Sequence, residues 1–119
     1  GLIDNLNALK NNNRYINTDM NRLWTDRIIQ LKSKKENEDR QEMLVLKNLI
    51  DKIIALKKKK NILIIDLHNT SSPNGVFTIV NNKTEQQIAE HLEIPVVNEL
   101  FSKVQGSLAE YYSSKKVRN

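Results

Sequence analysis

The residues best placed to carry out chemistry follow an apolar run in the middle of the chain. Asp66 and His68 end the run that begins at Asn61, and Asn69 and Thr70 come next. Side chains alternate along a strand, so Asp66 and His68 should project to the same side. In open α/β sheets ligands bind beyond the carboxyl ends of the strands, which makes these residues candidates for a binding or metal site. An Asp-x-His pair equally fits a polar cluster that ends a strand.

A second polar cluster lies near the start of the chain, where Arg14, Asp19, Asn21 and Arg22 occur within nine residues. A guanidinium group can bind a carboxylate through two parallel hydrogen bonds, and an Asn amide adds a further donor. The segment therefore suits recognition of a small carboxylate, and it equally fits an exposed loop with ion pairs. Because the chain has no cysteine, any metal site must use His, Asp or Glu.

Helices and short strands that alternate along the chain are expected to position these clusters. The clearest helix spans 36–56, where apolar residues recur every three or four positions, and we expect it to pack against a sheet. The run 61–67 has the continuous apolar character of a central strand buried on both faces. Shorter predicted elements are a helical turn over 5–9, a loop over 14–21, a short helix from about residue 22, strands over 76–80 and 94–97, and helices over 84–92 and 108–112, the first of these two with a capping box formed by Thr84 and Gln87.

This order of elements predicts an α/β fold, with a layered, mixed or mostly parallel sheet flanked by helices, in a single domain over residues 1–119. The formal net charge is +5, and the lysines gather at predicted element ends such as 57–60. A lysine run there matches the helix dipole and indicates a solvated rim. Aromatic residues are only 5% of the chain, which argues against a nucleic-acid surface. No apolar run approaches the roughly 18 residues of a membrane span, so we expect no membrane partner and a cytoplasmic location.

Two motifs resemble one enzyme family. The residues from Asp66, Asp-Leu-His-Asn-Thr-Ser-Ser followed by Asn74-Gly75, resemble a signature of the succinylglutamate desuccinylase/aspartoacylase family, which is similar to the zinc carboxypeptidases. The segment Arg-Tyr-Ile-Asn-Thr-Asp-Met-Asn-Arg over 14–22 resembles the family's Arg-Tyr-x-x-x-Asp-Leu-Asn-Arg segment, and the two motifs occur in the family's order. The resemblance implies a zinc-carboxypeptidase-like fold, a zinc cofactor, and hydrolysis of an amide bond in a small N-acyl amino acid.

The resemblance also implies a role for each site residue. His68 would be the third zinc ligand, and Arg14 would polarise the scissile carbonyl and stabilise its oxyanion. Asn21 and Arg22 would hold the substrate carboxylate. Carboxylates and amides next to metal ligands commonly orient them, and three residues are expected to act in this way: Asp19, Asp66 and Asn69.

The chain departs from the family pattern in two respects. The family takes its first two zinc ligands from an upstream His-Gly-Asn-Glu type segment, and no histidine precedes Arg14. It also uses a glutamate as general base, for which no match is found. We therefore expect an internal fragment from the middle of a catalytic domain, inactive alone. His91 is expected at the surface or at the edge of the core. The alternatives are a non-catalytic α/β binding module with a basic rim, or a zinc carboxypeptidase acting on peptides.

Overall fold

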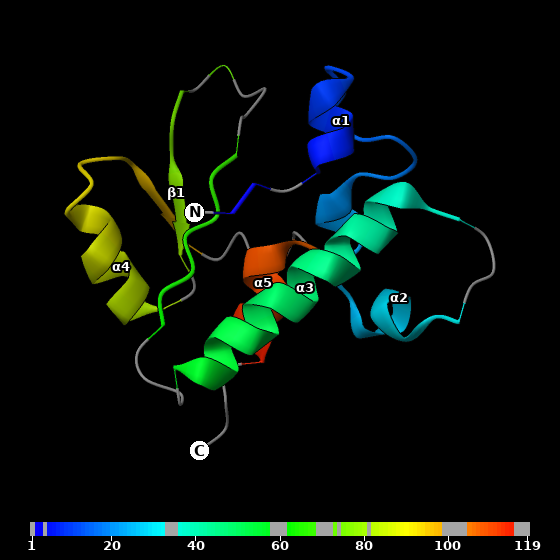
Figure 1. The fold of residues 1–119 in the computed structure, drawn as a ribbon. Helices are drawn as coiled ribbons and strands as arrows, with labels where there is room; N and C mark the ends of the chain where they lie inside the picture. Colours follow the sequence, from blue (N-terminus) through cyan, green and yellow to red (C-terminus); the bar gives the residue numbers. More distant parts are fainter. Residues whose placement is uncertain are drawn as a thin grey trace. The chain divides into compact units, whose positions relative to one another are not determined.

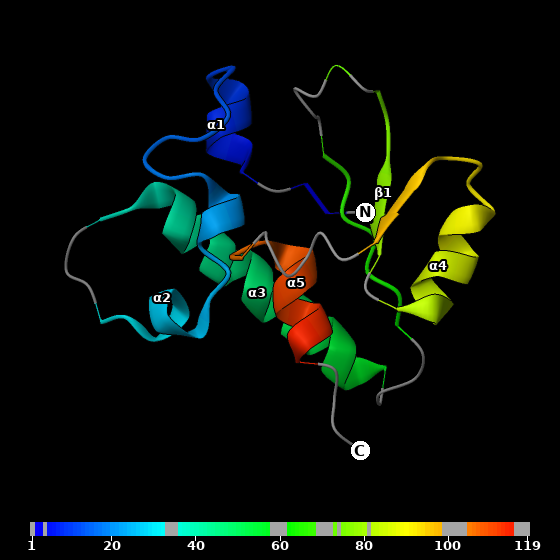
Figure 2. The same ribbon diagram turned by 180° about the vertical axis from the view of Figure 1, so that it is seen from behind.

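The fold was obtained as a computed structural model, which describes residues 2–3, 5–32, 36–57, 62–68, 73, 75–80, 82–98 and 105–115 (Figures 1 and 2). The chain divides into two compact units. The first comprises Gly1–Ile64 and Gly106–Asn119, and the second comprises Ile65–Gln105. The prediction that residues 1–119 form a single domain stays a prediction.

The described residues of the first unit are helical or irregular. Asparagine, threonine and serine side chains cap most of its helices by accepting a hydrogen bond from a backbone N–H group in the first turn. These residues favour such positions because a short polar side chain can replace the missing helical acceptor. The helices are α1 (Leu6–Lys10), the 3₁₀ helix η1 (Met20–Arg22), α2 (Asp26–Gln30), α3 (Glu38–Leu56) and α5 (Leu108–Ser114).

Helix α3 confirms the helix predicted over 36–56, and the helix predicted over 108–112 is confirmed as α5. Asn37 begins α3, where its side-chain oxygen accepts the backbone N–H of Arg40. The buried face of α3 lies in a core shared with residues of η1 and α5, and the expectation that this helix packs against a sheet stays a prediction. No helix among the described residues, α3 included, is long and apolar enough to cross a membrane.

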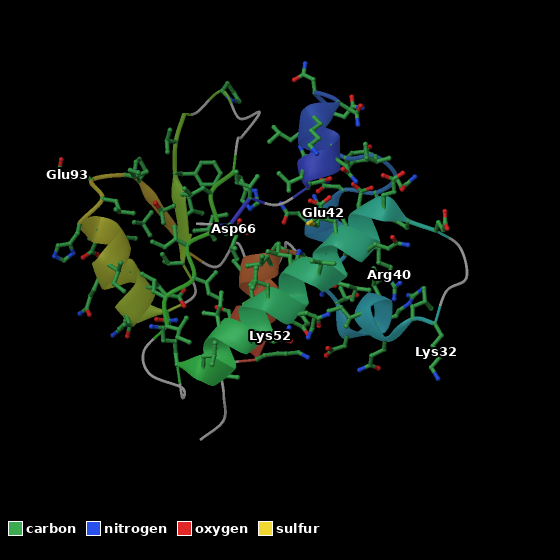
Figure 3. All side chains as sticks on the ribbon, in the orientation of Figure 1. Lys32, Arg40, Glu42, Lys52, Asp66 and Glu93 are labelled. Carbon is green, nitrogen blue, oxygen red and sulfur yellow. The ribbon has the colours of Figure 1, made fainter. Side chains whose placement is uncertain are left out.

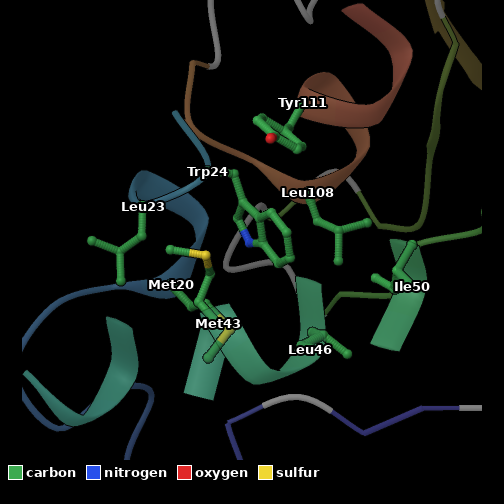
Figure 4. Close-up of a cluster of buried hydrophobic side chains, with 8 residues drawn as sticks. All are labelled: Met20, Leu23, Trp24, Met43, Leu46, Ile50, Leu108 and Tyr111. Carbon is green, nitrogen blue, oxygen red and sulfur yellow. The ribbon is translucent and has the colours of Figure 1, made fainter. Parts of the chain in front are cut away.

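The core of the first unit forms around Trp24, which is only 1% exposed (Figure 4). Its indole ring packs against two tyrosine rings of α5, with ring centroids 5.9 Å from Tyr111 and 6.0 Å from Tyr112. Aromatic side chains bury large areas and therefore dominate small cores. The other buried members of the cluster come from η1, the residue after it, α3 and α5: Met20, Leu23, Met43, Leu46, Ile50 and Leu108.

The second unit contains a strand, a helix and a second strand. Strand β1 (Thr78–Val80) pairs in parallel with β2 (Val96–Asn98), and helix α4 (Lys83–Glu90) connects them. Parallel strands need a crossover connection, and a helix usually supplies it. The predicted strands and the intervening helix are therefore confirmed, with shorter bounds. Helices with a small parallel sheet agree with part of an α/β fold, whereas the zinc-carboxypeptidase-like architecture stays a prediction.

The capping box predicted at Thr84 and Gln87 is wrong. Helix α4 begins at Lys83, one residue before the predicted start. Asn82 caps it by accepting the backbone N–H of Glu85 at 3.0 Å. The Glu85 side chain accepts a hydrogen bond from the Asn82 amide at 2.7 Å in return. Asn competes well for this position because it can both accept and donate.

The buried central strand predicted over 61–67 is also wrong. Residues 62–68 have no regular secondary structure, and Asn61 lies outside the described residues. Several of the apolar side chains are exposed, with Leu67 86% exposed. A strand is buried only where neighbouring strands pair with it, and the two-stranded sheet of β1 and β2 does not include this segment.

Candidate functional site

The first candidate cluster centres on an ion pair between Arg14 and Asp19. The Arg14 Nε and Nη2 atoms donate to the same Asp19 oxygen, Oδ2, at 3.1 and 2.8 Å. The other oxygen, Oδ1, accepts the backbone N–H of Asn21 at 3.0 Å and so caps η1. Asp19 therefore orients the guanidinium and begins the helical turn that follows. The Arg14 side chain is 68% exposed, which leaves it accessible to a ligand.

The two residues expected to hold a carboxylate lie on η1. Asn21 is partly buried, and Arg22 is exposed and donates from Nη1 to the Asn21 carbonyl oxygen at 2.9 Å. The loop predicted over 14–21 thus ends in a 3₁₀ turn that carries both residues. The expected role of Asp19 as a carboxylate that orients a histidine stays a prediction, and its observed partners are Arg14 and Asn21.

Gly106 supports this turn and was missed by the sequence analysis. It adopts φ +87°, and a Cβ atom built on it would lie 2.8 Å from the Arg22 carbonyl carbon. Its own carbonyl accepts the backbone N–H of Trp24 at 3.1 Å. Only glycine fits both the left-handed conformation and the close approach. The position before the last helix was a signal for a turn, but not for a contact with Arg22.

Asp39 is a second residue that supports the Arg14 segment and that the sequence analysis missed. Its side chain is buried, and its carboxylate accepts the backbone N–H groups of Ile16, Asn17 and Thr18 together with the Asn5 amide. Burial raises the pKa of Asp39, and hydrogen bonds from these four donors lower it. The lowering is the larger effect, so the pKa of Asp39 lies below its ordinary value. Asp39 therefore stays ionised and holds the loop between Arg14 and Asp19.

The second candidate cluster is the pair of Asp66 and His68 at the end of the apolar run, and Figure 3 labels Asp66. His68 Nε2 lies 2.9 Å from Asp66 Oδ2, so the two side chains do project to the same side. Asp66 is the more buried partner, with 17% of its side chain exposed against 43% for His68. A carboxylate on one ring nitrogen holds the imidazole in one orientation.

The predicted site residues thus form two local groups, one in each unit. Arg14 contacts Asp19 within the first unit, and Asp66 contacts His68 within the second. Asn69 lies outside the described residues. Within the part of the chain that the structure describes, no three His, Asp or Glu side chains group together to hold a metal ion. His68 and Asp66 form a contacting pair, and their expected roles as metal ligand and orienting carboxylate stay predictions.

Comparison with known protein families identifies the family of the chain. The model of the succinylglutamate desuccinylase/aspartoacylase catalytic domain matches residues 2–115, almost the whole chain. The chain belongs to this family. Its members are hydrolases that act on small acylated amino acids and are generally zinc-dependent. Searches of curated proteins and of solved structures found no match. Both motifs of the desuccinylase/aspartoacylase signature lie inside the matched region.

The other histidine of this desuccinylase/aspartoacylase domain is placed as predicted. His91 follows α4 at the surface, and its Nδ1 lies 2.6 Å from the carbonyl oxygen of Gln87. It thereby satisfies a carbonyl at the end of the helix, where a histidine side chain is commonly found. His91 is therefore a structural residue and provides a matched control for His68.

Proposed function

We propose that the protein is a zinc-dependent hydrolase that cleaves the amide bond of an N-acyl amino acid, and that this chain carries part of its active site. The single observation that supports this most directly is the contact between His68 and Asp66, 2.9 Å from Nε2 to Oδ2. Histidine ligands of metals usually donate their other ring N–H to a carboxylate. The family membership supplies the reaction class.

His68 would be one zinc ligand, with the Asp66 carboxylate 2.9 Å from Nε2 as the group that orients its ring. Asp66 fixes the imidazole orientation and increases the basicity of the ligating nitrogen. When bound, zinc supplies a Lewis acid that activates water at neutral pH. His68 is one of the three protein ligands that such a site needs, so we propose that other parts of the protein contribute the remaining two and the general base.

Arg14 would stabilise the negative charge that develops on the scissile carbonyl oxygen. Its exposed guanidinium is held at one end by Asp19. A preorganised cation costs little reorganisation when charge develops, which is why such donors are worth about 100- to 1000-fold in rate. Asn21 and Arg22, which follow on η1, would bind the carboxylate of the amino acid.

The test compares the two histidines in the protein expressed from its complete gene. We expect His68→Ala to lose bound zinc and hydrolysis of a panel of N-acyl amino acids, and His91→Ala to keep both. Asp66→Asn should weaken zinc binding by about 10- to 100-fold because the orienting carboxylate is lost. Zinc content and activity that both survive His68→Ala would refute the assignment. Peptide substrates in the same panel separate an amidohydrolase from a carboxypeptidase. The cytoplasmic location of the protein stays a prediction.

A further inference from the structure

Asp39 is a charged residue in the interior of the first unit, where its side chain is only 1% exposed. It lies in the first turn of α3, a place where an acidic residue is expected to point to solvent and complement the helix dipole. A buried carboxylate needs several donors to offset the loss of water. The identity of those donors indicates what Asp39 is for.

The donors are successive backbone N–H groups of the loop that leads from Arg14. Oδ2 accepts from Asn17 at 2.5 Å and from Thr18 at 2.8 Å. Oδ1 accepts from Ile16 at 3.0 Å, and the Asn5 amide donates to the same oxygen at 3.0 Å. Four donors occupy both oxygens, so Asp39 is committed to holding the loop and not to binding a ligand.

A second set of contacts ties the same loop to the start of α3. The Asn17 side chain accepts the backbone N–H of Glu38 at 3.0 Å, and the Asn37 amide donates to the Thr18 hydroxyl at 3.1 Å. The helix terminus and the loop therefore satisfy each other's polar groups. This matters because residues 16–18 belong to no helix or strand, so no regular secondary structure holds their backbone.

We infer that Asp39 is a positioning residue for Arg14, an inference that rests on the proposed function. Residues 16–18 lie between Arg14 and Asp19, and Asp19 holds the Arg14 guanidinium at 2.8 Å. Release of the loop would let Asp19 move, and the guanidinium would move with it. A displacement of about 1 Å in a catalytic group can lower the rate by roughly 100-fold.

The test measures kcat and KM for the zinc-loaded protein expressed from its complete gene. Asp39→Asn keeps the size of the side chain but turns one oxygen into a donor that faces backbone N–H groups. We expect kcat to fall by about 10- to 100-fold and KM to change much less, since Arg14 acts on charge that appears in the transition state. Amide exchange at 16–18 should become faster in the same variant.

Three comparisons separate positioning from general destabilisation. Met43→Ala opens a cavity one turn along α3, and it should leave kcat unchanged when assayed well below its melting temperature. In an Arg14→Ala background, Asp39→Asn should cause no further loss of kcat, because the group it positions is gone. Asn17→Ala, which removes only the contact with Glu38 from an exposed side chain, should lower kcat by about threefold even if Asp39→Asn does not fold.

Each result has one meaning. An unchanged kcat in Asp39→Asn overturns the inference. If Asp39→Asn does not fold, an unchanged kcat in Asn17→Ala overturns it instead. So does a full additional loss in the Arg14→Ala background, or an equal loss in Met43→Ala. Slow amide exchange at 16–18 in Asp39→Asn also overturns it, whatever the activity. Arg14→Ala that keeps full activity contradicts the proposed role of Arg14 instead.

Discussion

Replacing Gly106 by alanine tests whether the turn that carries Asn21 and Arg22 depends on a close backbone contact. The added Cβ would lie 2.8 Å from the Arg22 carbonyl carbon and 2.9 Å from both its Cα and its oxygen. All three atoms belong to the backbone, so no side chain can rotate away. The residue also has φ +87°, a conformation that alanine rarely adopts.

The two effects add to a measurable loss of stability. A left-handed alanine costs about 1–2 kcal/mol. Forcing a methyl group into a filled space costs about 1–3 kcal/mol more. The sum of about 2–5 kcal/mol is a large part of the free energy of unfolding of a small domain and corresponds to a melting temperature lower by roughly 10–25 °C.

Gly75 is the matched control, since it has φ +81° but nothing within 4 Å of its Cβ position. Gly75→Ala should therefore lose only the conformational part, about 1–2 kcal/mol. Thermal unfolding followed by far-UV circular dichroism compares the two variants, and fluorescence of Trp24 reports on the first unit. Equal losses in both variants would refute the steric argument, and no loss in Gly106→Ala would refute the geometry.

Two further predictions concern the first unit. The pKa of Asp39 is lower in the folded state than its ordinary value, so the stabilisation is present above about pH 4 and is lost as the pH falls through the folded-state pKa. The difference in melting temperature between the native protein and Asp39→Asn should therefore shrink below pH 4, and a constant difference from pH 7 to pH 3 would contradict the assignment. Arg40 Nε and Nη2 donate to the carbonyls of Ile28 and Leu31 at 3.0 and 2.6 Å, so Arg40→Met should cost about 1–3 kcal/mol and speed amide exchange in α2 (Figure 3). Gln41→Met on the exposed face should do neither.

The helices were predictable because their signals are local. Helix α3 follows from apolar residues at spacings of three and four and from acidic residues in its first turn. Only part of its predicted stripe is buried, however: Met43, Leu46 and Ile50 are in the core, whereas Leu49 is 42% exposed. Periodicity shows which side of a helix is apolar, but the extent of burial depends on what packs against it.

The strand predicted over 61–67 failed for the corresponding reason. An apolar run is compatible with a strand buried on both faces, but burial requires partners that hydrogen-bond on either side. Those partners come from elsewhere in the chain, and the sequence of the run does not indicate whether they are present. Strands β1 and β2 were easier to predict, since turn residues bound them and a helix separates them.

In the candidate site too, contacts between residues close in sequence were predictable and contacts between distant residues were not. Arg14 and Asp19 are five residues apart, and Asp66 and His68 two apart, so sequence motifs carry both pairs. Asp39 lies 21 to 23 residues from three of its donors, and those three are backbone N–H groups that every non-proline residue has. No pattern of residue types could identify them. Gly106 contacts the Arg22 backbone and was missed for the same reason.

This difference bears on how the site depends on the fold. A pair of neighbours such as Asp66 and His68 needs only a short stretch of backbone in the correct conformation. The Arg14 guanidinium depends in addition on Asp39, and Asp39 is in place only while α3 is folded and packed. Partial unfolding of α3 should thus release Arg14 while leaving the histidine pair intact. Under mild denaturant, the rate of hydrolysis should fall before zinc is lost, and loss of both at the same denaturant concentration would show that the two clusters unfold together.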